Sequence, residues 1–378
     1  MVRYTLPPEW LSLGQQDPDD SDSSDTSSTT DDIPELLPRA PSPEINRSNL
    51  PPTHMNEPTP RSNPKLNQEW RDFYSTALNP SSGTAGTSPQ LYRRSMQPAL
   101  FPTKNAHAGS TFTKDYDGLR CWSTNANTVL LSNDLAEFHE LCHSLKAHSV
   151  GILAIQEVNQ NLLDRNIYNQ LEDALKLHFG ACVLVSSSTP IRSPTSWKPG
   201  GTILAVLGTW SHTVTATSSD SLGRWCKATL SGRDGSLLSV YSLYNVVKTD
   251  ISKVGPATIF AQQWQLLRLS GHEKPDPRQQ CIDDLKIEVQ KEQNIGSEIV
   301  IMGDLNEVVG DDPALMASVC ATCHLYDPFS DLYPDQADTP TYARGRKRLD
   351  WVFVSRSLSP TIDAVGYNRY NLLYHSDH

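Results

Sequence analysis

The chain has 378 residues, of which 37% are hydrophobic, and a formal net charge of −11 at pH 7. This negative balance excludes a basic protein that holds nucleic acid by charge alone, although carboxylates gathered around a metal ion would contribute to the same sign. The seven cysteines are odd in number and scattered, and no apolar run has transmembrane length, so we expect an intracellular protein, nuclear or cytoplasmic and not secreted, without a disulfide framework or a membrane partner.

The segment before Tyr116 differs in composition from the rest of the chain. It holds more than half of the 27 prolines and long Ser, Thr and Asp runs, such as SDSSDTSSTTDD from Ser21. Such a segment buries too little apolar surface to offset its chain entropy. We therefore predict a disordered tail over residues 1–115, with one short helix at 66–78, and a globular domain over residues 116–378. The tail is a candidate docking segment for a protein partner.

Apolar segments of strand and helix type alternate along the globular part. Runs rich in Val, Ile and Leu predict strands at 119–126, 150–159, 181–188, 200–208, 223–231, 236–247, 298–306 and 348–356. Amphipathic spacing predicts helices at 133–148 and 162–179, a long helical region over 256–294 that is interrupted near GHEKPDPRQ, and a short helix at 312–324. Strands and helices mixed in this order favour layered sheets covered by helices.

Several of these strands end in the same kind of residue. The run IVIM breaks into GDLNE, with Asp304 and Asn306, and the run VGILAIQ ends at Glu157. RLDWVFVS carries Asp350, and the chain stops at residues 376–378, Ser-Asp-His. Such strand ends converge if the strands share a sheet edge. Hard oxygen ligands with a histidine suit Mg²⁺ or Mn²⁺ and attack of water on a phosphodiester.

The motifs QEVN, GDLNE, RLDWVFVS and SDH occur in this order along the chain. In this order they resemble the endonuclease/exonuclease/phosphatase family, over residues 119–378 and over none of the tail. The resemblance implies an α/β fold, a four-layer sandwich of two mixed β-sheets flanked by helices. It also implies a hydrolase that cleaves phosphodiesters with Mg²⁺ as cofactor, or with Mn²⁺ in its place.

The resemblance also implies roles for individual positions. Glu157 in QEVN corresponds to the metal-binding glutamate of the family. Asp377 is implied to lie near the same metal ion. Asp350 is implied to orient the imidazole of His378, which stabilises the transition state.

Further roles follow for the remaining motifs. Asp304 is implied to position or deprotonate the attacking water, and Asn306 to hold the phosphate. Asn125, in STNANT, is implied to orient the base. Tyr244 stands where the family has a tyrosine near the reacting phosphate, with Tyr241 as the rival for that position.

Within the family, the motifs favour a nuclease. GDLNE and PTYARGRKRLDWVFV are similar to endonucleases of non-LTR retrotransposons, which makes DNA the expected nucleic-acid partner. Arg346 and Arg348 are expected to contact backbone phosphates. A solvated basic loop is the alternative reading of these arginines. A family phosphatase or ribonuclease acting on another phosphoester is the alternative function.

The chain stops on the histidine of SDH, where the family has one further strand. We therefore expect a domain that lacks its last strand, because terminal residues without anchoring tend to fray. An inactive, truncated domain that acts through an interaction tail is the corresponding alternative function.

A different reading comes from HELCH at residues 139–143, which matches the HExxH signature of zinc proteases. The helical spacing places His143 towards solvent, and the continuation with a glycine and a third histidine is absent. Glu172 is left as a distant third ligand for a zinc ion at His139 and His143. A solvated helix face is the favoured interpretation. The single CxxC at Cys320 and Cys323 likewise favours two half-buried thiols on a helix.

Overall fold

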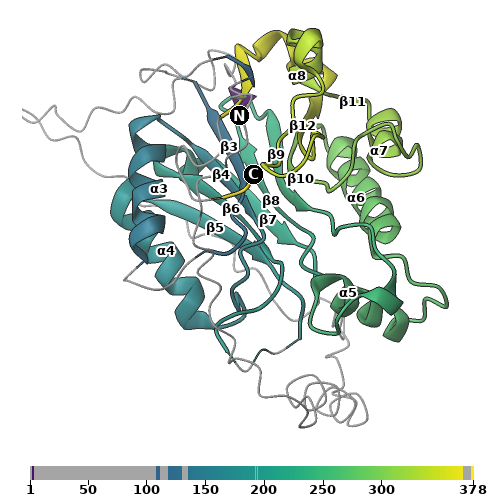
Figure 1. The fold of residues 1–378 in the computed structure, drawn as a ribbon. Coiled ribbons are helices and arrows are strands. Elements are labelled where there is room, and N and C mark those ends of the chain that lie inside the picture. The colour runs from purple at the N-terminus through teal and green to yellow at the C-terminus, as the bar shows by residue number, and fades with distance from the viewer. Residues whose placement is uncertain are drawn as a thin grey trace, which may run out of the picture. The chain divides into compact units, whose positions relative to one another are not determined.

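The computed structural model describes residues 2–3, 108–110, 118–129, 135–191, 193, 195–368 and 376–378. The helix that was expected at 66–78 lies outside the described residues. Strands occupy the middle of the described part, and helices flank them on two sides (Figure 1).

Two β-sheets form the centre of the part of the chain that the structure describes. The first has the strand order β2-β13-β1-β3-β4-β6-β5. Its strands span Val2–Arg3 (β1), Ala108–Gly109 (β2), Arg120–Asn125 (β3), Ile152–Gln156 (β4), Cys182–Ser187 (β5), Thr202–Leu207 (β6) and Ala364–Tyr367 (β13). The second has the order β11-β12-β10-β9-β8-β7. Its strands span Val214–Ser219 (β7), Trp225–Ser231 (β8), Leu237–Tyr244 (β9), Ser297–Asp304 (β10), Leu325–Tyr326 (β11) and Asp350–Ser355 (β12).

Helices cover the outer faces of both sheets (Figure 1). They span Ala136–Ala147 (α3), Arg165–Phe179 (α4), Ile259–Leu269 (α5), Pro277–Asn294 (α6), Met316–Cys323 (α7) and Pro328–Leu332 (α8). One apolar core lies between the sheets and includes Ile152 and Val240. A second core joins α3 and α4 to the first sheet through side chains such as Phe138. A third joins α6 and α7 to the second sheet and includes Leu285. These four layers confirm the predicted α/β sandwich of two mixed sheets.

Local sequence explains where the long helices begin and end. The Asp164 side chain accepts a hydrogen bond from the Asn166 backbone N–H at the start of α4. That helix stops at Gly180, whose φ of 79° is a conformation that glycine adopts without strain. Asp276 caps α6 in the same way, and Pro277 opens it at a position where no N–H is needed.

Strand direction brings several polar strand ends to one edge. The strands β3 and β4 run parallel and pair Asn125 with Gln156, next to the edge. The strands β9 and β10 also run parallel and pair Tyr244 with Asp304. Because β12 runs antiparallel to β10, its first residue, Asp350, lies opposite Asp304. Side chains from five strands therefore reach the same edge of the sandwich.

Two short strands come from the segment that was expected to be a disordered tail. Val2–Arg3 pairs with both β13 and β3, and Ala108–Gly109 pairs with β13. Two residues carry too little pattern to be recognised as a strand in a sequence. Residues 1, 4–107 and 111–115 of that segment lie outside the described residues.

The region 256–294 forms two helices, α5 and α6, and they are separated at GHEKPDPRQ as predicted. Other elements of the globular part were not predicted, among them the short β11, β13 and α8. The strand β7 was not predicted, because its sequence VTATSS is polar and mostly exposed at the edge of the second sheet.

The seven cysteines are all unpaired, and Cys320 and Cys323 lie half-buried and buried on α7. None of the helices in the described ranges combines the length and the apolar character that a membrane span requires.

A buried lysine lies in the loop between β5 and β6. The side chain of Lys198 is 2% exposed, and its Nζ donates to the Thr189 carbonyl. No carboxylate among the described residues forms an ion pair with it. Burial lowers the pKa of Lys198 to about 8, from an ordinary value of 10.5. The folded protein therefore holds a charge that water would solvate better.

Replacement of Lys198 by Met is expected to raise the free energy of unfolding by about 2 kcal/mol at pH 7, because the desolvation cost that it removes exceeds the contribution of the one hydrogen bond that it loses. The unfolded chain binds more protons than the folded protein between pH 8 and 10.5, so the wild type gains stability over that window. Urea unfolding at pH 7 and at pH 10 should therefore show the advantage of the variant shrinking as the pH rises. A variant less stable than the wild type at pH 7 would show that the Thr189 hydrogen bond outweighs the desolvation.

Candidate active site

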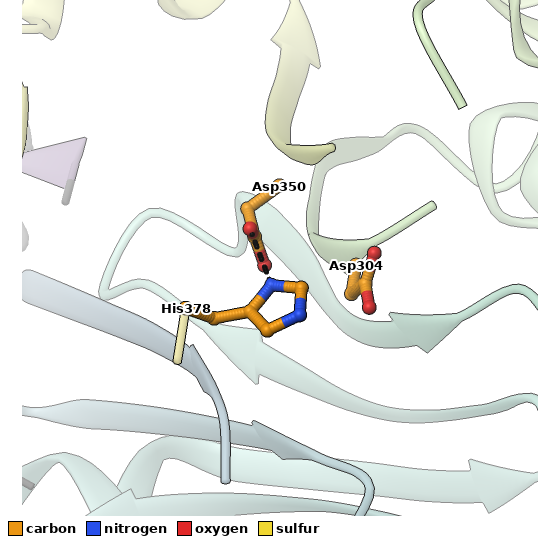
Figure 2. A group of neighbouring side chains, drawn as sticks. All are labelled: Asp304, Asp350 and His378. Atoms are coloured by element: carbon orange, nitrogen blue, oxygen red, sulfur yellow. Dashed lines mark hydrogen bonds and ion pairs between the residues drawn. The ribbon is translucent and has the colours of Figure 1, made fainter. Parts of the chain in front are cut away.

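The centre of the site is a group of two carboxylates and one imidazole. Asp304 is the last residue of β10, Asp350 is the first residue of β12, and His378 comes from the SDH motif (Figure 2). One oxygen or nitrogen atom of each lies within 4.8 Å of the others. Residues far apart in the sequence thus meet because β10 and β12 are neighbours in register.

His378 is held by Asp350. Its Nδ1 donates to Asp350 Oδ2 over 2.9 Å, and the other ring nitrogen lies on the side of Asp304 (Figure 2). Burial by itself lowers the pKa of His378, but the carboxylates of Asp350, Asp304 and Asp377 outweigh it and raise the pKa to about 9. The imidazole is therefore positively charged at neutral pH.

The carboxylate of Asp304 is fully buried. One oxygen accepts from the Asn306 backbone N–H over 2.8 Å, and the other accepts from Asn125 Nδ2 over 2.8 Å and from Asn306 Nδ2 over 3.1 Å. Burial raises the pKa of Asp304 most, the Asp350 charge raises it further, and His378 and the hydrogen bonds offset part of the increase. A carboxylate with a raised pKa is a stronger base than a solvated one.

Asn306 has less freedom than the resemblance implies. Its amide donates to the Asn245 carbonyl over 2.9 Å and to Asp304. Both amide hydrogens are therefore engaged within the protein, and Asn306 positions Asp304 in this structure. The contact of its amide with a phosphate stays a prediction.

Glu157 comes directly after β4, in a left-handed backbone conformation with φ 49°. Tyr244, the last residue of β9, donates its hydroxyl to Glu157 Oε1 over 2.6 Å. The other candidate, Tyr241, packs in the apolar core between the second sheet and the outer helices, together with Leu285, and does not contact Glu157. Because side chains alternate along a strand, only one of the two tyrosines can face the site, and Tyr244 is that residue.

The SDH segment is tied to neighbouring elements. The Ser376 hydroxyl donates to the Asn125 carbonyl, and the Asp377 carbonyl accepts from the Ala343 backbone N–H over 2.7 Å. One carboxylate oxygen of Asp377 accepts from Asn127 Nδ2 over 3.2 Å. These contacts place the segment beside the strand ends, with His378 turned towards Asp350.

The two arginines that were expected to bind phosphate have different environments. Arg346 is exposed. The side chain of Arg348 is 1% exposed and binds Asp327 through two nitrogens, over 2.6 and 2.8 Å. Its guanidinium also lies 4.0 Å from the ring centroid of Trp351. Arg348 is a structural residue, which corrects its expected contact with substrate. Arg344, which is exposed, is the arginine that lies beside Asp377, at 3.9 Å.

Some residues around the site were missed by the motif-based analysis. Arg278 on α6 donates to the Val246 carbonyl and forms a buried ion pair with Glu307 Oε2 over 3.0 Å. Glu307 also accepts from the Met316 backbone N–H over 3.0 Å. This pair supports the turns that follow β9 and β10. Glu307 is visible in GDLNE, whereas nothing in the sequence of α6 marks Arg278.

The loop before β12 contributes two more residues. The ring centroid of Tyr342 lies 5.0 Å from that of His378. Thr341 Oγ1 accepts from the backbone N–H groups of Leu349 and Asp350, each over 2.9 Å. The motif PTYARGRKRLD therefore supports both Asp350 and the imidazole that it orients.

The donor set fits a divalent ion with a preference for oxygen. Asp304 and Asp350 lie close together, and the repulsion between them is a cause of the raised pKa of Asp304. A cation at this place would relieve that repulsion, and carboxylate oxygens are the ligands that Mg²⁺ prefers. Glu157 and Asp377, the expected metal ligands, are not members of the tight group, although Asp377 precedes His378 and Glu157 contacts Tyr244.

The structure is similar to the AP endonuclease LMAP from Leishmania major, with a TM-score of 0.49 and 16% identity, over 69% of this chain and 85% of that one. It is similar to the catalytic domain of Xenopus laevis APE2, with a TM-score of 0.43 and 13% identity, over 67% and 94%. A third similar structure is the endonuclease domain of TRAS1, a telomere-specific non-LTR retrotransposon, with a TM-score of 0.41 and 14% identity, over 69% and 94%.

The curated proteins contain no match to this chain. The model of one protein family does match, over residues 121–378, which is more than half of the sequence and includes every residue of the candidate site. The chain therefore belongs to the Endonuclease/Exonuclease/phosphatase family.

Proposed function

We propose that the chain is a phosphodiester hydrolase that depends on Mg²⁺, with Mn²⁺ as a substitute, and that it is a DNA endonuclease of the retroelement type. The observation that supports it best is the triplet of Asp304, Asp350 and His378 at one strand edge. A buried base beside a charged imidazole supplies both a proton acceptor and a positive charge, which hydrolysis of a phosphodiester requires.

In this proposal, each residue has a separate task. Asp304 takes the proton of the attacking water, and Asn125 and Asn306 hold its two oxygens in place. His378, charged through Asp350, donates a hydrogen bond to a phosphoryl oxygen as negative charge develops there.

Glu157 and Asp377 would hold the metal ion with the oxygens of the triplet, and Tyr244 orients Glu157. The ion, when bound, neutralises charge on the phosphoryl oxygens. The family resemblance implies these roles for five of the residues, Asn125, Glu157, Asp304, Asp377 and His378, and the contacts described above support them.

The finer assignment, a DNA endonuclease, is supported by the sequence of the loop before β12. PTYARGRKRLDWVFV is similar to non-LTR retrotransposon endonucleases, and in this structure Arg344, Arg346 and Lys347 of that loop are exposed. Exposed cations next to a phosphodiester-cleaving site suit contacts to the backbone on either side of the scissile bond.

Nicking of supercoiled plasmid tests the proposal. We expect the full chain to convert supercoiled to open-circular DNA in Mg²⁺, and we expect no conversion after chelation or with Asp304→Asn. Addition of Mg²⁺ in excess over the chelator should restore the activity of the wild type but not of the variant.

Parallel assays on single-stranded RNA and on a small phosphomonoester separate the branches of the family. Faster cleavage of either substrate than of DNA would replace the endonuclease by a ribonuclease or a phosphatase. A folded wild type without activity on all three substrates would contradict the proposal of an active enzyme.

A further inference from the structure

A group of three histidines lies outside the candidate active site. Helices α3 and α4 lie side by side on the outer face of the first sheet (Figure 1). His139 Nδ1 on α3 lies 2.9 Å from His178 Nε2 on α4, and the two ring centroids are 5.2 Å apart. His143 follows His139 by four residues, so it lies on the same side of α3, one turn further along.

The contact between His139 and His178 requires neutral imidazole. In a hydrogen bond between two rings, one nitrogen donates its proton and the other accepts it, so two charged rings cannot form it. Burial lowers the pKa of His178 most, and the nearby His139, His143 and Lys146 lower it further. Neutral imidazole is also the form that binds a metal ion.

We propose that His139, His143 and His178 form a binding site for a divalent transition-metal ion of the zinc class, separate from the candidate active site. Two nitrogens that bind the same tetrahedral Zn²⁺ at 2.0–2.1 Å lie about 3.3 Å from each other. The observed separation of 2.9 Å therefore needs to widen by about 0.4 Å when the ion replaces the shared proton.

The third ligand is not in place in this structure, because His139, His143 and His178 do not have their ligand atoms within 4.8 Å of one another. His143 is exposed, and the proposal requires its side chain to turn along α3 towards the pair. Two histidines four residues apart on one helix are an established arrangement for zinc, and imidazole suits Zn²⁺, Ni²⁺ and Cu²⁺ but not Mg²⁺. Water completes the tetrahedron. Lys146 opposes the charge of the ion, but it is exposed and solvent screens it.

This site differs from the zinc-protease reading of HELCH. Glu172, the third ligand in that reading, forms an ion pair with Lys176 over 3.0 Å, and His178 takes its place. The proposed site joins two helices and has a structural role, because the ion binds only when α3 and α4 are packed together. It is expected to stabilise the folded state by linkage.

Titration of the full chain with Zn²⁺ tests the proposal. The titration is carried out in millimolar Mg²⁺, which occupies oxygen ligands at the active site but does not compete for imidazole. Calorimetry should detect one Zn²⁺ per chain, and Co²⁺ in its place should give the visible absorption of a tetrahedral nitrogen site. The thermal unfolding midpoint should rise with Zn²⁺ concentration.

Variants of each ligand decide whether the ion lies at the histidines. His139→Gln, His143→Gln and His178→Gln are each expected to weaken Zn²⁺ binding at least tenfold, while the exposed control His212→Gln binds as the wild type does. The unfolding midpoint of each variant without metal shows whether it is folded. The proposal is overturned if the wild type binds no Zn²⁺, or if the three variants keep wild-type affinity. Loss of binding in Asp304→Asn alone would place the ion in the active site and would also overturn it.

Discussion

Substitution of Glu157 by Gln is expected to lower the rate of plasmid nicking by about 10²-fold or more and to leave the thermal unfolding midpoint unchanged. Gln keeps the size of the side chain and the Oε1 acceptor for the Tyr244 hydroxyl, which now lies 2.6 Å away. It removes only the negative charge that would bind the metal ion. Because Glu157 is half-exposed at the end of β4, the packed core does not change.

The dependence on metal concentration separates a ligand from a merely nearby charge. The Mg²⁺ concentration that gives half-maximal nicking should rise for Glu157→Gln. Tyr244→Phe is the matched control, because it keeps the carboxylate and removes the hydrogen bond to it. We expect a smaller effect for this variant, about 10–100-fold, as for other residues that orient a metal ligand. Nicking at the wild-type rate by Glu157→Gln would remove Glu157 from the metal site.

The second large effect is expected on stability. Arg348→Met should lower the free energy of unfolding by about 3–5 kcal/mol, because it leaves the Asp327 carboxylate without its cation in a mostly buried place. It also removes the hydrogen bond from Nε to the Tyr367 hydroxyl over 2.8 Å. The methionine fills part of the space between the aromatic rings, so most of the loss comes from charge and hydrogen bonds.

Arg346→Met is the matched control, since Arg346 is exposed two residues earlier in the same loop. Its effect on the free energy of unfolding should stay within about 0.5 kcal/mol. Urea unfolding of both variants, monitored by tryptophan fluorescence, gives the two values. If Arg348→Met were as stable as the wild type and bound DNA more weakly, Arg348 would be a substrate contact, as the sequence alone suggested.

Arg346 and Arg348 differ in a way that could not be predicted from the sequence. In GRKRLD, the three basic positions are equivalent as charges, and nothing local distinguishes a phosphate contact from a buried ion pair. The partner of Arg348 is Asp327, 21 residues earlier in the chain. Arg278 was missed for the same reason, because its partners Val246 and Glu307 lie 32 residues before it and 29 residues after it.

The sequence by itself determined the layered fold, the strands that carry the motifs and the identity of Asp304, Asp350 and His378. Short-range patterns are sufficient for the strands and for Asp304 and Asp350, because a carboxylate at the end or the start of a buried strand is a local feature, and the family resemblance adds His378. Only the tertiary structure decided that Tyr244 and not Tyr241 contacts Glu157, that the amide of Asn306 is engaged by Asp304, and that His178 meets His139. Each of these depends on which face of an element is packed against another, and that follows from contacts between segments far apart in the chain.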